Sequence, residues 1–110
     1  MTLRKTVKGE DVLAGLIRKA IEFRADEIEI EIEYKVGYEE VFAMRNCLGT
    51  GVGRIRSDSE EARALRRLLN KVKGKTEIRV DGDDYQIRVD IHESFSEDAF
   101  RVSFRRLKSS

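Results

Sequence analysis

The sequence predicts an α+β fold: a two-layer sandwich with two helices on one face of a mainly antiparallel, five-stranded sheet. Two segments place apolar residues at helical spacing, and five others alternate apolar and polar residues as half-buried strands do. The expected order along the chain is α-β-β-α-β-β-β. Helices and strands that are apolar on one side only bury those sides most simply when both helices cover the same sheet face.

The first half of the chain supplies a helix and two strands. The helix is expected over residues 10–24, with an apolar stripe made of Val12, Leu13, Leu16, Ile17, Ala20 and Ile21. A strand over 27–34 follows, in which isoleucines and Tyr34 face one side and four glutamates the other. Residues 35–38 form a turn into a second strand over 39–45, and the glycine-rich segment 46–53 is expected to be a loop.

The second half begins with a helix and continues with three strands. Ser57 and Glu60 have the spacing of a capping box, and Gly74 is a natural helix stop. The buried stripe of this helix is expected to consist of Ala62, Leu65, Leu68, Leu69 and Val72. Strands over 76–80 and 85–91 flank Asp81-Gly82, a strong hairpin signal, and the last strand over 99–105 turns Phe100, Val102 and Phe104 inward.

A second fold remains open at the amino-terminal end. Leu3, Lys5 and Val7 could form a weak leading strand, which would give a ferredoxin-like β-α-β-β-α-β start followed by a β-hairpin. No linker, repeat or low-complexity segment divides the chain in either case. We therefore expect one domain over residues 1–110.

The overall composition restricts the classes of partner. The chain has 22 basic and 21 acidic residues, which argues against a general nucleic-acid binder or a protein of anionic membrane surfaces. Cys47 is the single cysteine, so no internal disulfide can form. No apolar run approaches the ~20 residues of a membrane span. We expect a cytoplasmic protein that makes no membrane contact.

The glycine-rich segment is the first candidate site. Its backbone could approach a small anion or a nucleotide, and the site would consist of Gly49, Gly51, Gly53, Arg54 and Arg56. However, the segment matches neither the P-loop nor the dinucleotide-binding pattern. Acidic residues at the start of the next helix would also repel an anion. A plain connection between a strand and a helix is the favoured interpretation.

Other candidate sites have simple structural explanations. The glutamates of the 27–34 strand fit a solvated face, with Arg88, Arg101 or Arg105 as cross-strand partners. Asp81, Asp83 and Asp84 lack the remainder of a calcium-loop pattern. Cys47 and His92 are single copies without a recognisable catalytic motif. We therefore expect no enzymatic activity, no metal site and no cofactor.

The exposed face of the second helix is basic and is a candidate partner surface. It carries Arg63, Arg66, Arg67 and Lys71. This face could contact an acidic protein, or nucleic acid weakly. A nucleic-acid module usually adds exposed aromatic residues for base stacking, and none is expected to point outward. Protein contact is therefore the favoured interpretation of this face.

Three segments carry a family resemblance. Residues 20–31 (AIEFRADEIEIE) resemble the helix-to-strand segment in the amino-terminal module of type II secretion and type IV pilus motor ATPases. Residues 87–90 (IRVD) and 97–105 (EDAFRVSFR) are similar to two later strands of that module. The chain contains no P-loop, so the resemblance implies a non-catalytic module that packs against partners. Glu29 replaces a family histidine, and the family-like residues 79–82 follow the second helix instead of preceding it.

These observations favour a non-catalytic protein-interaction or regulatory module. We expect it to recognise a partner through a sheet edge, at 76–80 or 99–105, or through a charged face. The same edges could support a homo-oligomer.

Overall fold

The computed structural model describes residues 7–33, 37–46, 48–72, 74–94 and 97–107. Two helices, α1 (Gly9–Glu22) and α2 (Glu60–Lys71), are each followed by three strands. The first three are β1 (Glu27–Glu33), β2 (Tyr38–Arg45) and β3 (Leu48–Arg56), and the second three are β4 (Gly74–Val80), β5 (Asp83–Ser94) and β6 (Glu97–Arg106). The α+β class is confirmed. The predicted count of five strands is wrong, because β3 replaces most of the predicted loop.

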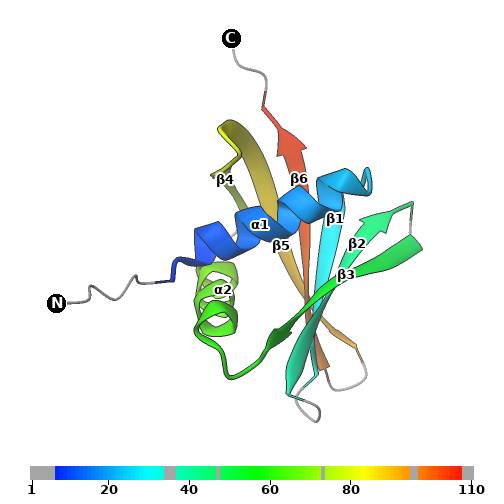
Figure 1. The fold of residues 1–110 in the computed structure, drawn as a ribbon, viewed down its shortest axis with the longest axis vertical. Coiled ribbons are helices and arrows are strands. Elements are labelled where there is room, and N and C mark those ends of the chain that lie inside the picture. Colours follow the sequence, from blue (N-terminus) through cyan, green and yellow to red (C-terminus); the bar gives the residue numbers. More distant parts are fainter. Residues whose placement is uncertain (1–6, 34–36, 47, 73, 95–96, 108–110) are drawn as a thin grey trace, which may run out of the picture.

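The described strands form one antiparallel sheet in the order β3-β2-β1-β6-β5-β4 (Figure 1). β1 and β6 pair in the centre, and the two three-stranded meanders extend to opposite sides. The ferredoxin-like alternative is wrong, since three strands separate the helices where that fold has two. Val7 lies outside any strand, and Leu3 and Lys5 lie outside the described residues.

The core lies between the helices and one face of the sheet, which we call the inner face. α1 runs across this face and contacts β1, β2, β3 and β4, while α2 packs against α1 and β3 (Figure 1). The inward strand residues join the helix stripes in one cluster, which includes Leu13, Ile17, Ile28, Ile30, Leu65, Leu69, Ile87, Phe100, Val102 and Phe104. Ile21, predicted to be buried, is 37% exposed in the last turn of α1.

The two helices approach each other closely at Gly9. A Cβ atom added there would lie 2.5 Å from the Ala64 carbonyl oxygen and 2.9 Å from the Leu68 Cβ. Neither distance is compatible with van der Waals contact, so only glycine fits at this point of the packing. The first residue of α1 therefore fixes how near α2 can lie.

Of two local signals in the sequence, the structure confirms the predicted hairpin and contradicts the predicted helix cap. The Asp81-Gly82 hairpin is confirmed, with φ values of +49° and +83° and Val80 paired with Asp83. The predicted cap of α2 is wrong, because Ser59 rather than Ser57 is the N-cap. The Ser59 Oγ accepts a hydrogen bond from the Ala62 amide at 3.1 Å. β3 continues to Arg56, so the chain reaches the helix two residues later than the capping pattern suggests.

Candidate functional site

Among the described strands, β3 and β4 lie at the two edges of the sheet. The predicted edge at residues 76–80 lies within β4 and is confirmed as an edge. The predicted edge at 99–105 is wrong, because those residues belong to β6, which pairs with both β1 and β5. The β3 edge is not among the predicted edges, because its first residues belong to the predicted loop over 46–53.

β3 occupies most of the segment that was predicted to be a loop. Gly49 and Gly51 lie directly opposite Met44 and Phe42 on β2, with a β-bulge before Gly53. A Cβ atom on Gly49 would approach the Met44 sulfur to 3.0 Å, so the bare glycine leaves room for that side chain. Low strand propensity of glycine favoured the loop. Leu48, Thr50 and Val52 nevertheless alternate with the glycines at a period of two, and this signal could have identified the strand.

The two arginines of the predicted anion site already have acidic partners. Arg54 lies 3.0 Å from Glu40 and its guanidinium stacks over the Tyr38 ring, while Arg56 lies 3.3 Å from Asp58. Gly49, Gly51, Gly53, Arg54 and Arg56 therefore follow one edge strand, and they do not form a free loop. Anion binding by these residues stays a prediction, without the loop geometry that motivated it.

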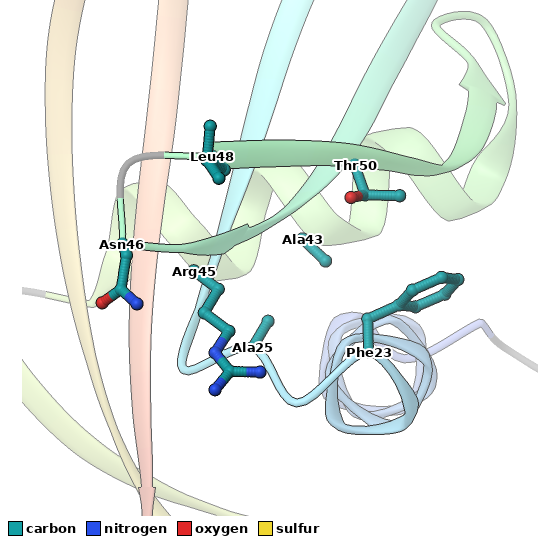
Figure 2. A pocket seen from close by; sticks show the side chains of 7 residues that line it. All are labelled: Phe23, Ala25, Ala43, Arg45, Asn46, Leu48 and Thr50. Carbon is teal, nitrogen blue, oxygen red and sulfur yellow. The ribbon is translucent and has the colours of Figure 1, made fainter.

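A cleft of about 310 Å³ adjoins the beginning of β3. It lies between the carboxyl end of α1 and the β2–β3 hairpin. Figure 2 shows Phe23 on the helix side and Leu48 and Thr50 on the hairpin side, with Ala25 and Ala43 between them. The two alanines are buried, whereas Phe23 is 51% and Leu48 77% exposed. The cleft thus combines a buried apolar floor with exposed apolar walls.

Arg45 and Asn46 supply the polar side of this cleft. In Figure 2 the Arg45 side chain extends toward the α1–β1 connection near Ala25. Arg45 is exposed and forms no hydrogen bond or ion pair with any residue that the structure describes. Since Arg45 is the one charged residue among the described residues that line the cleft, its electrostatic character is positive.

A buried carboxylate on the inner face is the most unusual polar group of the described chain. Glu39 is 0% exposed, and neither carboxylate oxygen has a hydrogen-bond partner among the described residues. Its Oε1 lies 3.5 Å from the Nε of Arg66 on α2. Burial raises the pKa of Glu39, and the positive charge of Arg66 counters part of that rise. Glu39 lies on the same buried side of β2 as Val41 and Ala43. This alternation in the sequence could have predicted its burial.

The predicted partner surface on α2 is only partly free. Besides its ion pair with Glu39, Arg66 donates a hydrogen bond to the Ser57 carbonyl at 2.8 Å. Arg63 donates to the Asp58 carbonyl at 2.7 Å. These two hydrogen bonds engage Arg63 and Arg66 at the start of α2, while Arg63, Arg67 and Lys71 are exposed. The Arg66 side chain is 27% exposed, and the four-residue partner surface stays a prediction.

Three glutamates of β1, Glu27, Glu29 and Glu31, point to the outer face of the sheet, as predicted. Arg101 on β6 lies 3.5 Å from Glu29 and 4.0 Å from Glu27, which confirms one predicted cross-strand partner. Arg88 pairs instead with Asp90, and Arg105 donates to Gln86. The row is therefore a solvated, ion-paired sheet surface in this region.

The remaining candidates form no site in the described chain. Asp81, Asp83 and Asp84 pair with Arg18, Arg106 and Arg79, respectively. Among the described residues, no three histidine, cysteine, aspartate or glutamate side chains are grouped to hold a metal ion. Cys47 and the side chain of His92 lie outside what the structure describes. The prediction that they form no catalytic motif is therefore not tested. Within the described part of the chain, neither helix is long and apolar enough to span a membrane.

Comparison with known proteins adds no family. No protein-family model matches the chain, and no curated protein matches it significantly. The resemblance to the motor-ATPase module therefore stays a prediction. The observed order of elements also has one strand more than the order on which that resemblance partly relied.

Proposed function

We propose that this protein is a non-catalytic interaction module whose β3 edge accepts an extended segment of a partner protein as an additional strand. The observation that carries the proposal is the coincidence of an edge strand with a cleft that has an apolar floor and one charged residue, Arg45. β3 spans nine residues, and its first five, Leu48–Val52 in the one-letter form LGTGV, carry no charge. An added strand gains main-chain hydrogen bonds from such an edge, and a neighbouring pocket selects one of its side chains.

The two edges differ in how well they are protected against pairing. β4 carries Lys75, Glu77 and Arg79 at alternate positions, and charged side chains of this kind discourage strand addition. The first half of β3 has no such residue. Proline, another common protection, does not occur in the chain. We therefore assign the partner to β3 rather than to β4.

The cleft defines the chemistry of the partner segment. An apolar side chain would lie on Ala25 and Ala43 between Phe23 and Leu48, burying apolar surface on both sides. An acidic side chain next to it would pair with Arg45, the charged residue of the cleft. The expected partner sequence is an extended segment with an apolar anchor beside an aspartate or glutamate.

Selection from a display library of random nine-residue peptides tests this function. We expect the enriched peptides to combine an apolar residue with an acidic one. Amide resonances in residues 48–52 and near Phe23 should shift on titration. Leu48→Ser should weaken binding about tenfold, as truncation of an anchor contact does. Thr50→Lys places a charge on the edge and should abolish strand addition.

Ile91→Ser is the matched control, because Ile91 is also an exposed aliphatic residue, at 55%, but lies on β5 away from the cleft. Peptide affinity should be unchanged in this variant. The proposal is wrong if no peptide is enriched, or if the enriched peptides bind the Thr50→Lys variant as tightly as the parent protein. Equal losses in the Leu48 and Ile91 variants would also contradict it.

A further inference from the structure

The outer face of the sheet carries a group of cations at the end opposite to β3. Lys75 on β4 lies directly opposite Arg88 on β5, and Arg105 on β6 lies directly opposite Gln86. Gln86 precedes Arg88 by two residues and therefore shares its face. Together with Ser103, these side chains line a depression of about 170 Å³.

The positive charges in this depression are poorly compensated. Lys75 has no carboxylate within ion-pair distance in the described chain, and Arg105 donates only to the neutral Gln86 amide, at 3.2 Å. Among the described residues, Arg88 has one acidic partner, Asp90, at 3.7 Å on its own strand. Like charges directly opposite one another, as Lys75 and Arg88 are, destabilise a sheet. The arrangement costs stability unless an anion occupies it.

Neighbouring arginines on the same strands form ion pairs with aspartates. Arg79 on β4 lies 3.4 Å from Asp84, and Arg106 on β6 lies 3.2 Å from Asp83. Each of these pairs joins two strands and neutralises its arginine. Around the depression itself, Glu77 lies on the same face of β4 directly opposite Gln86 but forms no ion pair with a described residue, so three cations remain beside this one neighbouring carboxylate and Asp90.

We propose that this depression binds a single phosphate group. A phosphate dianion would receive hydrogen bonds from the two guanidinium groups and from the Lys75 ammonium, with the Gln86 amide as a neutral donor. Its charge would remove the repulsion between Lys75 and Arg88. The Ser103 hydroxyl is already directed to Glu27, to which it donates at 3.3 Å.

The surroundings favour a compact ligand over a long polyanion. Glu27 and Glu29 of β1 lie on the same face of the sheet. They are directly opposite Ser103 and Arg101, respectively, on the neighbouring strand β6. A nucleic-acid backbone crossing the sheet would approach these carboxylates and be repelled. A free phosphate or a phosphorylated side chain of a protein brings one phosphate group near Glu27, where a nucleic-acid backbone would bring several.

Titration of the full chain with inorganic phosphate, at constant ionic strength, tests the site by amide shifts and by melting temperature. We expect saturable shifts confined to the strand residues around Lys75, Arg88 and Arg105, and a melting temperature that rises with phosphate. Arg88→Gln should weaken binding about fivefold or more, the loss of a charge-assisted contact on an exposed surface. Without phosphate this variant should be at least as stable as the parent, because it removes a like-charge pair.

Arg79→Gln is the matched control: it lies on the same face of β4 as Lys75, is paired with Asp84 and does not line the depression. Phosphate affinity should change less than about twofold. Tighter binding of a phosphoserine peptide than of free phosphate would assign the phosphate to a protein. The proposal would be overturned if no amide shift saturates by about 10 mM phosphate, a concentration far above the dissociation constants of typical specific sites. Equal losses of phosphate affinity in both variants would also overturn it. Preferential, steeply salt-dependent binding of single-stranded RNA would overturn it as well.

Discussion

The carboxylate of Glu39 on β2 and the guanidinium of Arg66 on α2 form an ion pair, 3.5 Å apart, between the sheet and the second helix. Glu39 is fully buried, whereas the Arg66 side chain is 27% exposed. Arg66 also donates to the Ser57 carbonyl in the connection that follows β3. One partly solvated cation therefore compensates a buried charge and holds the segment that leads from the β3 edge into α2.

Removing Arg66 should destabilise the fold far more than removing a neighbouring arginine. Arg66→Met leaves the Glu39 charge buried without compensation, and we expect a loss of about 3 kcal/mol, the lower end of the range for broken buried pairs. Arg67→Met, at an exposed position of the same helix, should cost less than about 0.5 kcal/mol. Urea unfolding at pH 7 measures both. Replacing both partners, as Glu39→Leu with Arg66→Met, should restore most of the stability; equal effects of the two single arginine variants would refute this role.

The buried carboxylate should also make stability depend on pH in a defined direction. Burial raises the native pKa of Glu39 above its ordinary value of 4.5, so the folded state holds the proton more tightly than the unfolded state. The resulting stabilisation is fully present below pH 4.5 and is lost as the pH rises through the native pKa. The difference in unfolding free energy between the parent and Glu39→Gln should therefore fall with rising pH and then level off. A difference that grows with pH would mean that the Arg66 charge outweighs burial.

Local periodicity accounts for the parts of the fold that the sequence predicted well. The alternation in β1 places Ile28, Ile30 and Ile32 in the core, and Asp81-Gly82 forms its hairpin because those two residues tolerate positive φ. Both signals involve neighbours in the chain. Such signals do not depend on how distant segments of the chain pack.

Pairing between distant segments accounts for the errors. The last strand was expected at an edge, yet β6 lies in the centre because it pairs with β1 at the opposite end of the chain. β3 was missed because its glycines have low strand propensity, although they pair with Met44 and Phe42 of β2 and the Met44 side chain lies against Gly49. Burial of Glu39 likewise depends on the packing of α1 across β2 and on the approach of Arg66 from α2, which no local pattern determines.

Two helical glycines should respond oppositely to the same substitution. Gly9→Ala places a Cβ atom 2.5 Å from the Ala64 carbonyl oxygen, so α1 and α2 must separate, and we expect a loss of about 2 kcal/mol. Gly15→Ala meets only the end of the Arg18 side chain, at 3.9 Å, and should gain about 0.5–1 kcal/mol from helix propensity. Thermal or urea unfolding of the two variants decides the matter. A gain in both would show that the helices do not pack as closely as described.

The two serines before α2 provide a similar contrast, and they separate the observed cap from the one that the sequence pattern suggested. Ser59→Ala removes the hydrogen bond that Oγ accepts from the Ala62 amide and should cost about 1 kcal/mol. The Ser57 Oγ is buried without a hydrogen-bond partner among the described residues, so Ser57→Ala removes an unsatisfied hydroxyl. We therefore expect Ser57→Ala to be neutral or slightly stabilising in urea unfolding. If the Ser57 variant loses more stability than the Ser59 variant, the helix begins at the earlier cap, and the connection between the β3 edge and α2 is shorter than described.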